Sequence, residues 1–499
     1  MTVSDDDEKV DLIQADPDQL ADPERPLDVK GTLDQLRRTR LRLRLAMSAD
    51  TAGKALAEAI TIWQDFQSLF HHVREQHTHR SDDPAWTQKL EHCIAADIAL
   101  QMSFEGVLQA LQACRFRAEL IERYEVVFAA DRLKQSPWLT ERTREDIVTE
   151  RLSASRLWDH YLSARVFCLG QKWSLKQLPD LLSSPQRSIR RAALRGLNDW
   201  LQLQDTALDA EFTNLLTVRR QLATKLRLPA GQMLSRPLTD FPAATQENRV
   251  KYLQLVQQFL VPMALEVRRL QRRRLSLDQL QDYDVLCLLP GGMPPDKVAI
   301  SVSHIHQAGP IPKPFDYPKD STLKSGFLSY AQMILTIHAP SDSERDTELN
   351  RLLTLTRWLE WLVWLASADD FVVAVSEGNV QDPALRRNMW LELESRYFPD
   401  IHHDQMPALA AGSLAYLTIR DWLMPGSHLA DALSLLSALA FWYRRKGNLL
   451  KATDDLASLT QIAGDLTFEE LLQKAKLEMP WDETQFKQLM FALASDLDL

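Results

Sequence analysis

The chain of 499 residues lacks the short motifs that mark the commonest enzyme classes. It has no His-Glu-x-x-His, no Gly-x-Ser-x-Gly, no Gly-x4-Gly-Lys-Ser/Thr and no Gly-x-Gly-x-x-Gly string. The first of these binds zinc, because two histidines four residues apart share one helix face and the glutamate beside the first polarises the attacking water. The others expose a serine nucleophile or cradle phosphate groups. Their absence excludes the ordinary zinc-protease, serine-hydrolase and nucleotide-binding interpretations.

Cysteine and long apolar runs are also scarce. The four cysteines are Cys93, Cys114, Cys168 and Cys287. They lie far apart without a Cys-x-x-Cys spacing, which predicts reduced thiols rather than a disulfide framework. Among the most apolar stretches, 358–366 falls short of the roughly 20 residues that cross a bilayer, and it contains Glu360. No basic start followed by an apolar run marks a secretory signal. We therefore expect a cytoplasmic protein without a membrane span.

Negative charge is concentrated at the N-terminus. Residues 1–25 hold nine Asp or Glu and two Lys or Arg, out of a net charge of -10 for the whole chain. This composition predicts that 1–28 is an acidic, disordered tail. The remainder is close to neutral, and we expect no nucleic-acid partner. Two arginine clusters, at 37–44 and 268–274, are expected to form solvated or salt-bridged helix faces.

The chain as a whole is 45% apolar, and we predict a mostly helical protein with a large core. Apolar residues return at intervals of three and four almost throughout 32–275. Within this range, Ser184 and Pro185 predict the start of a long helix that runs to about Leu226, because serine caps free amides and proline fits the first helical position.

A Pro- and Gly-rich stretch then interrupts the helical pattern, which resumes at about Glu344. Apolar residues alternate at 298–302 and at 333–337, which predicts two short strands. We therefore divide the chain into an acidic tail, an N-terminal helical lobe, a connection with short strands and a C-terminal helical lobe. Their predicted bounds are 1–28, 29–288, 289–340 and 341–499.

Three segments resemble signatures of the M3 metallopeptidases, in particular the oligoendopeptidases. They are 176–201 (KQLPDLLSSPQRSIRRAALRGLNDWL), 260–284 (LVPMALEVRRLQRRRLSLDQLQDYD) and 382–398 (DPALRRNMWLELESRYF). The first has the family's two arginines at a spacing of three, the second ends in its Tyr-Asp pair, and the third has its Trp-x-Glu-Leu-Glu. The resemblance covers about 139–499. It implies a mostly helical, two-lobed, zincin-derived fold with a small β-element.

The catalytic positions depart from this family. Counting from Lys324–Gly326, which resembles the family's Lys-x-Gly-Gly, its His-Glu-x-x-His motif is expected near 355–359, where the sequence reads Leu-Thr-Arg-Trp-Leu. Leu355 and Leu359 cannot bind zinc, and Thr356 is no general base. Alternatively, the predicted helix that contains 355–359 corresponds to the helix that precedes the family's Val-Asp-Glu-Phe-Gln segment, which 368–372 resembles. In that case the zinc-binding helix of the family is deleted from this chain. Either alignment predicts no zinc or other cofactor.

Two further departures agree with this prediction. Between Leu359 and Asp369 too few residues remain for the helix that carries the third zinc ligand in the family, so we expect a shortened C-terminal lobe. The family's substrate-side histidines and tyrosines correspond roughly to Arg420, Trp422 and 425–431, where only the proline is retained.

The histidines offer three places for a replacement metal site. The first group is His71, His72, His77 and His79; the second is His304 and His306; the third is His402 and His403 with Asp400 and Asp404. Their spacings are poor for zinc or lack a further ligand nearby. We therefore favour solvated loop or helix-end histidines over metal ligands in all three.

Trp358, Trp361 and Trp364 are spaced by three and form a stripe on one predicted helix. Core packing is the simpler interpretation. In the family this helix lines the cleft, so the stripe, together with Arg420 and Trp422, is also a candidate cleft or partner-binding surface.

These observations predict a pseudopeptidase, a catalytically inactive M3-like protein that binds a peptide or protein, with a paralogous active peptidase as one candidate partner. The alternative is an active zinc metalloendopeptidase of oligopeptides with rearranged ligands. A structural subunit with a closed cleft is a third hypothesis.

Overall fold

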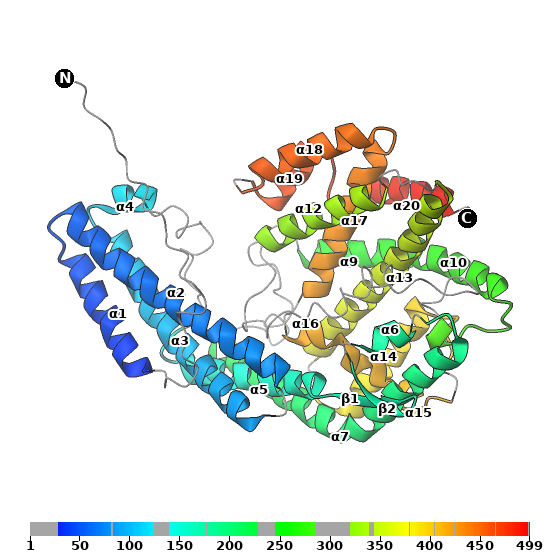
Figure 1. Cartoon of the computed structure of the whole chain (residues 1–499), viewed down its shortest axis with the longest axis horizontal. Helices are drawn as coiled ribbons and strands as arrows, with labels where there is room; N and C mark the ends of the chain where they lie inside the picture. Colours follow the sequence, from blue (N-terminus) through cyan, green and yellow to red (C-terminus); the bar gives the residue numbers. More distant parts are fainter. Residues whose placement is uncertain are drawn as a thin grey trace. The chain divides into compact units, whose positions relative to one another are not determined.

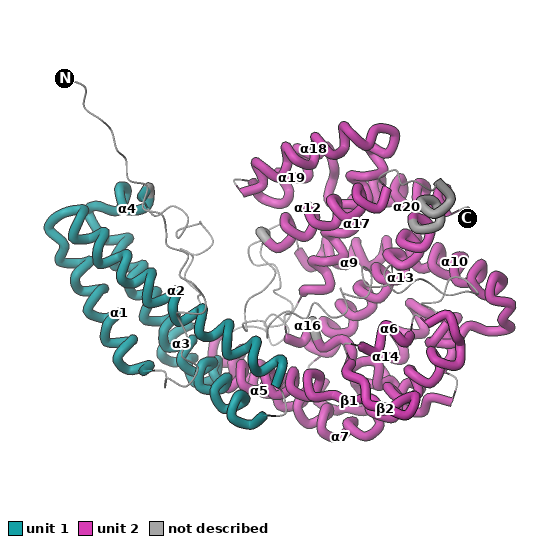
Figure 2. The backbone as a smooth tube through the Cα atoms, viewed as in Figure 1, with its two compact units in different colours: residues 1–148 teal, residues 149–499 magenta. Residues whose placement is uncertain are grey.

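The computed structural model divides into two compact units, residues 1–148 and 149–499 (Figure 2). The ranges that it describes are 28–80, 83–123, 139–175, 177–182, 184–227, 245–284, 320–338, 344–378, 380–403, 405–423, 426–464 and 466–497, with residue 499. The acidic tail, apart from Asp28, lies outside these ranges. So do the predicted strand at 298–302 and the connection as far as residue 319.

Unit 1 is built from helices that pack on one another. They are α1 (Val29–Arg44), α2 (Ala49–His79), α3 (Pro84–Gln112) and the short α4 (Arg117–Arg123) (Figure 1). Helix α2 starts at a capping box in which Ser48 and Thr51 each accept a hydrogen bond from the other's backbone amide. Asp83 caps α3, whose first residue is Pro84. Helix α5 (Arg144–Leu162) then continues into unit 2.

Unit 2 is mostly helical, with one small hairpin. Its further elements, in chain order, are β1 (Arg165–Cys168), β2 (Gln171–Ser174), α6 (Leu178–Leu182), α7 (Arg187–Lys225), α9 (Gln246–Leu255), η3 (Val256–Leu260), α10 (Val261–Arg274), η4 (Asp282–Asp284), α12 (Asp320–Ile337), α13 (Glu344–Glu377), α14 (Pro383–Tyr397), α15 (Pro407–Ala410), η5 (Ser413–Thr418), α16 (Ile419–Leu423), α17 (Ser427–Arg445), α18 (Leu449–Ile462), α19 (Phe468–Lys474) and α20 (Glu483–Leu497). None of the helices in the described ranges is long and apolar enough to cross a bilayer.

Helix α13 is the central element of unit 2. It packs against α10, α14, α16, α17, α20 and η3. One hydrophobic cluster includes residues from both sides of the predicted connection, such as Leu201, Leu260, Leu362 and Leu433, which are all 0% exposed. The helices on either side of the connection therefore share a core.

The β-hairpin was missed by the sequence analysis, which expected an almost wholly helical pattern here. Strands β1 and β2 are antiparallel and only four residues each. Leu169 and Gly170 join them with φ values of 53° and 80°, and two left-handed residues are what a tight hairpin turn requires. Helix α7 passes close to β1, because a Cβ on Gly196 would lie 2.7 Å from the Val166 side chain.

The predicted strand at 333–337 is wrong, because these residues belong to α12. Met333, Leu335 and Ile337 occupy alternate positions, but Ile334 between them is also apolar, and the buried stripe of the helix follows a different spacing. Its members are Leu323, Phe327, Tyr330, Ala331, Ile334 and Leu335. These intervals of three, four and one follow the helical period, which the short alternation concealed.

The long helix predicted from Pro185 to about Leu226 is confirmed as α7, but it begins two residues later, at Arg187. The Arg190 guanidinium explains the shift. It donates hydrogen bonds to the carbonyls of Ser184 (2.9 Å) and Pro185 (3.1 Å). Ser184 accepts from the Gln186 amide at 3.2 Å instead of capping the helix itself.

A π-helical turn, η3, joins α9 to α10. Its Gln257 side chain donates to the Tyr397 hydroxyl at 3.1 Å, and Val256 and Leu260 are fully buried. A π-turn adds one residue to the α-helical count, so it sets which face of α10 meets α13.

Candidate functional site

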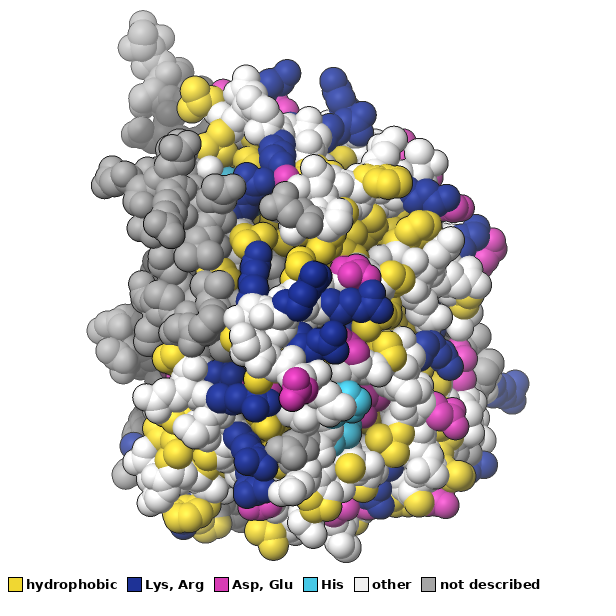
Figure 3. All heavy atoms as spheres, turned by 90° about the vertical axis from the view of Figure 1, so that its right-hand side faces the viewer, with side chains coloured by type: hydrophobic (Ala, Val, Ile, Leu, Met, Phe, Trp, Pro, Cys, Tyr) yellow, Lys and Arg dark blue, Asp and Glu magenta, His cyan; other side chains and the backbone are white. Residues whose placement is uncertain are grey.

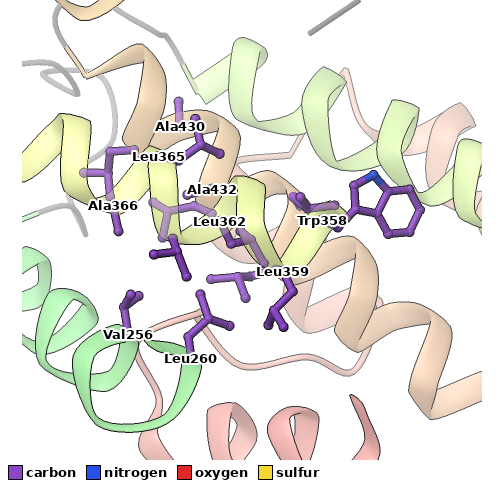
Figure 4. Packing of buried hydrophobic residues seen from close by; sticks show 14 of the residues in the cluster. Val256, Leu260, Trp358, Leu359, Leu362, Leu365, Ala366, Ala430 and Ala432 are labelled. Carbon is purple, nitrogen blue, oxygen red and sulfur yellow. The ribbon is translucent and has the colours of Figure 1, made fainter. Parts of the chain in front are cut away.

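The positions expected for the zinc motif are packed in the core of unit 2. Leu355 and Leu359 are each 1% exposed and Thr356 is 5% exposed. The Thr356 hydroxyl donates to the Leu352 carbonyl at 2.9 Å, so its hydrogen bond stays within the helix. Figure 4 shows Leu359 and Leu362 of α13 with Val256 and Leu260 of η3 in the same cluster. The leucine and valine side chains have no metal-binding atom, and the Thr356 hydroxyl is engaged within its own helix.

A cavity next to Thr356 is small. It is lined by Val267, Leu270, Gln271, Arg274, Leu352, Leu353, Thr356 and Leu497, and its volume is about 20 Å³. That volume holds about one water molecule. A peptide side chain therefore has no room between α10, α13 and α20 at this point.

The tryptophan stripe of α13 is partly core. Trp358 is 3% exposed, while Trp361 and Trp364 are half-buried and pack against the same cluster. The Trp364 ring meets Trp390 edge to face, with centroids 5.4 Å apart, and lies 6.5 Å from Phe398. Such aromatic pairs stabilise a core beyond the area that they bury.

Trp422 is likewise a core residue. It is 1% exposed and its Nε1 donates to the Thr418 hydroxyl at 3.0 Å. Its ring contacts Phe212 and Phe371, with centroids 5.2 and 6.3 Å away. Since Phe371 also meets Trp390, the structure brings Trp364 and Trp422 to opposite ends of one aromatic cluster. The side chain of Arg420 is outside the described part.

The residues that resemble family signatures meet one another in the fold. Arg187 and Arg190 of α7 both hold the carboxylate of Asp284, at 2.8 and 2.9 Å. Arg190 Nε also donates to the Tyr283 carbonyl, and Gln271 Nε2 donates to the Asp284 carbonyl. Asp284 is 0% exposed and Arg190 is 2% exposed. Sequence reasoning found both motifs but not this contact, because about a hundred residues separate them.

A second buried cluster joins α10 to α13. Arg268 is 0% exposed and forms ion pairs with Glu360 (2.7 Å) and Asp400 (2.9 Å). Burial raises the pKa of Glu360 above its ordinary value, although the Arg268 guanidinium opposes the shift. Asp400 therefore pairs with Arg268 and not with the neighbouring histidines.

The segment 368–372 and the third signature also form one buried polar cluster. Arg249 of α9 donates to Asp369 at 2.7 Å. The Tyr397 hydroxyl donates to Asp370 at 3.1 Å, and Tyr397 itself is 0% exposed. The 34-residue helix α13 carries both this segment and 355–359.

His403 is held between two carboxylates. Its Nδ1 lies 2.5 Å from Asp282 and its Nε2 lies 2.9 Å from Glu394. Burial opposes the charged imidazolium, but the hydrogen bonds to both carboxylates raise the pKa of His403 to about 10. Because the two carboxylates bond opposite nitrogens of one ring, the three groups do not converge on a point where a metal could bind.

We expect this clamp to make stability depend on pH. A folded pKa of about 10 against an ordinary value of 6.5 means that the contribution is complete below pH 6.5 and is lost as the pH rises towards 10. Between pH 6 and pH 9 the free energy of unfolding should fall by roughly 2 to 3 kcal/mol through this group. Urea titrations of the wild type and His403→Gln measure the difference. Equal slopes against pH in both proteins would contradict the clamp.

The other histidines do not assemble into a site within the described residues. His77 is buried in α2, whereas His71 and His79 are exposed. His402 is exposed, and its carbonyl accepts from the Asp282 amide at 3.3 Å. His304, His306 and Asp404 lie outside the described ranges. Where the structure describes the chain, no three His, Cys, Asp or Glu side chains come together as metal ligands.

The arginine cluster at 268–274 divides into one buried and several exposed members. Arg268 belongs to the core, whereas Arg269, Arg272, Arg273 and Arg274 are exposed on α10. Figure 3 views the side on which α10 ends in Figure 1, and shows Lys and Arg side chains interspersed with Asp and Glu. The expectation of a solvated or salt-bridged face is confirmed for Arg269, Arg272, Arg273 and Arg274, and it is wrong for Arg268, which is buried in the core.

Comparison with solved structures decides the fold. PZ peptidase A with a bound inhibitor superposes with a TM-score of 0.77 at 18% identity, covering 95% of this chain and 98% of that chain. The chain has the oligoendopeptidase fold. Oligoendopeptidase F from Enterococcus faecium superposes with a TM-score of 0.66 at 11% identity, with 95% and 97% of the chains covered. A Bacillus anthracis protein assigned to oligoendopeptidase F gives 0.71 at 18% identity, with the same coverage.

No family model and no curated protein matches the sequence. The resemblance to M3 peptidases is nevertheless confirmed at the level of the fold, as is the prediction of a mostly helical protein. The signature residues that carried it, such as Arg190, Asp284, Trp390 and Tyr397, are buried parts of the scaffold. These buried residues belong to the scaffold and not to the positions 355–359 where the zinc motif is expected.

Proposed function

We propose that this chain is a non-catalytic protein with the oligoendopeptidase fold, which acts by binding a peptide or another protein. The burial of Leu355, Thr356 and Leu359 in the core of unit 2 carries the proposal. A zinc-activated water needs metal ligands and a general base on a surface that substrate reaches. Hydrophobic side chains at 1% exposure and a threonine bonded within its own helix supply neither.

A binding role is what the same fold offers when catalysis is lost, because oligopeptide enzymes present a surface shaped for extended chains. A paralogous active peptidase is one candidate partner. The burial of Trp358 and Trp422 supports a core role for these two rings, which leaves partner recognition to other surfaces. Cys93, Cys114 and Cys168 are free thiols, which supports a cytoplasmic location.

We expect the purified chain to leave oligopeptide libraries uncut, with or without added zinc, and to contain far less than one zinc per molecule after dialysis. An oligoendopeptidase with an intact His-Glu-x-x-His motif serves as the positive control. Mass spectrometry of the peptides and elemental analysis of the protein are the measurements. Metal-dependent cleavage that a chelator abolishes would revive the alternative of an active enzyme with rearranged ligands.

Restoring the motif alone should not create activity. The variant Leu355→His/Thr356→Glu/Leu359→His places three polar groups where the wild type has core residues, and burying them unpaired is costly. We expect a lower melting temperature and no cleavage. Peptide cleavage by this variant at the wild-type melting temperature would show that 355–359 lies in a working cleft.

A further inference from the structure

The last turn of α1 and the residues that follow it expose an apolar strip with arginines around it. Leu41, Leu45 and Met47 are 56%, 67% and 82% exposed, although all three are large apolar side chains. The opposite face of α1, with Leu36 and Leu43, is buried in unit 1. An exposed apolar cluster of this kind is uncommon unless something covers it.

Two arginines beside this strip have no ion-pair partner among the described residues. Arg38 precedes Leu41 by three positions and Arg44 follows it by three, so both side chains neighbour Leu41 on the helix surface. Both are exposed. Among the other arginines of α1, Arg37 pairs with Asp34 and Arg42 pairs with Glu58, while Arg40 is half-buried. The strip and its free charges fit a segment that is both acidic and apolar.

The chain supplies such a segment directly before α1. Residues 4–25 contain nine Asp or Glu and two Lys or Arg. Apolar side chains are interleaved with these acids, and they are Val10, Leu12, Ile13 and Leu20. Carboxylates pair well with guanidinium groups, and the apolar side chains gain by leaving water together.

The length of chain allows this segment to fold back. Helix α1 has 16 residues and is therefore about 24 Å long. The chain between Leu20 and Val29 spans up to roughly 30 Å when extended. Residues 10–20 therefore reach Leu41 and Leu45 near the far end of α1.

We propose that residues 10–20 dock on the exposed strip of α1 in the same molecule, with the apolar side chains on Leu41, Leu45 and Met47 and the carboxylates on Arg38 and Arg44. The segment covers a surface that would otherwise attract unrelated apolar chains. The inference is independent of whether the chain is catalytic.

Photo-crosslinking in the full-length chain tests the docking. With p-benzoylphenylalanine in place of Ile13, irradiation should give a cross-link within one molecule, which tryptic mass spectrometry places in 37–48. The substitutions Arg38→Glu and Arg44→Glu should together reduce its yield at least fivefold. Arg272→Glu with Arg273→Glu makes the same charge change on α10 and should leave the yield unchanged.

A charge swap distinguishes pairing from a change in folding. Asp16→Arg and Asp18→Arg, combined with Arg38→Glu and Arg44→Glu, should restore most of the lost cross-link. Raising the salt concentration should weaken the wild-type cross-link, because exposed charges are screened. Cross-links that form covalent dimers would assign the strip to a second copy. Cross-links that map outside 37–48, or that survive both arginine changes, would overturn the proposal.

Discussion

Trp358→Ala is expected to lower the free energy of unfolding by about 3 to 5 kcal/mol. Trp358 is 3% exposed within the cluster around α13, so its removal leaves a cavity that close-packed neighbours cannot fill. Trp361→Ala should cost less, because that ring is only half-buried. Urea unfolding followed by circular dichroism measures both.

Leu203→Ala is the matched control, since Leu203 is 81% exposed on α7 and its loss should change stability by less than about 0.5 kcal/mol. If Trp358→Ala behaves like this control and instead abolishes capture of a partner, the stripe is a binding groove. That outcome would also remove the main support for a filled core at the motif positions.

Asp284→Ala should destabilise the chain by a similar amount, about 3 to 5 kcal/mol, because it removes one member of a buried charge cluster. Without this carboxylate the guanidinium of Arg190, 2% exposed, remains buried with no counter-charge. The hydrogen bonds to Arg187 are lost as well. The melting temperature and urea midpoint are the measurements.

Asp278→Ala provides the comparison, because Asp278 is an exposed aspartate in the same segment and should tolerate the change. A melting temperature of Asp284→Ala within a degree of the wild type would show that the cluster contributes little. The further variant Asp284→Asn keeps the shape and some hydrogen bonds, so it should lie between the two.

The fold was predictable because the signature motifs follow one another along the chain in the same order as in the family and consist of chemically distinctive residues. Arg187, Arg190 and Asp284 appear in the sequence as parts of two separate motifs. Their meeting point was not predictable, because a spacing of three within a helix is local information whereas contact between distant segments depends on tertiary packing. The same holds for His403, whose partners are Asp282 and Glu394, whereas the nearby Asp400 pairs with Arg268.

The prediction of secondary structure from the sequence failed where the pattern of apolar residues was short. The hairpin of β1 and β2 has four-residue strands, too few for alternation to stand out inside a helical region. At 333–337 three apolar residues occupy alternate positions, but Ile334 between them is apolar too, and α12 buries a longer stripe that begins at Leu323. At 355–359 the sequence showed side chains that are not zinc ligands in the expected motif, and the structure added that they are packed in the core.

The π-turn η3 decides which residues of α10 face α13. With the same sequence, an unbroken α-helix through 256–260 would turn everything after it by about 100° relative to α9. Arg268 would then leave Glu360 and Asp400, which it now contacts at 2.7 and 2.9 Å, and Val267 would take its place. Residues that make no ion pair themselves therefore decide whether a charge or an apolar side chain meets these two carboxylates.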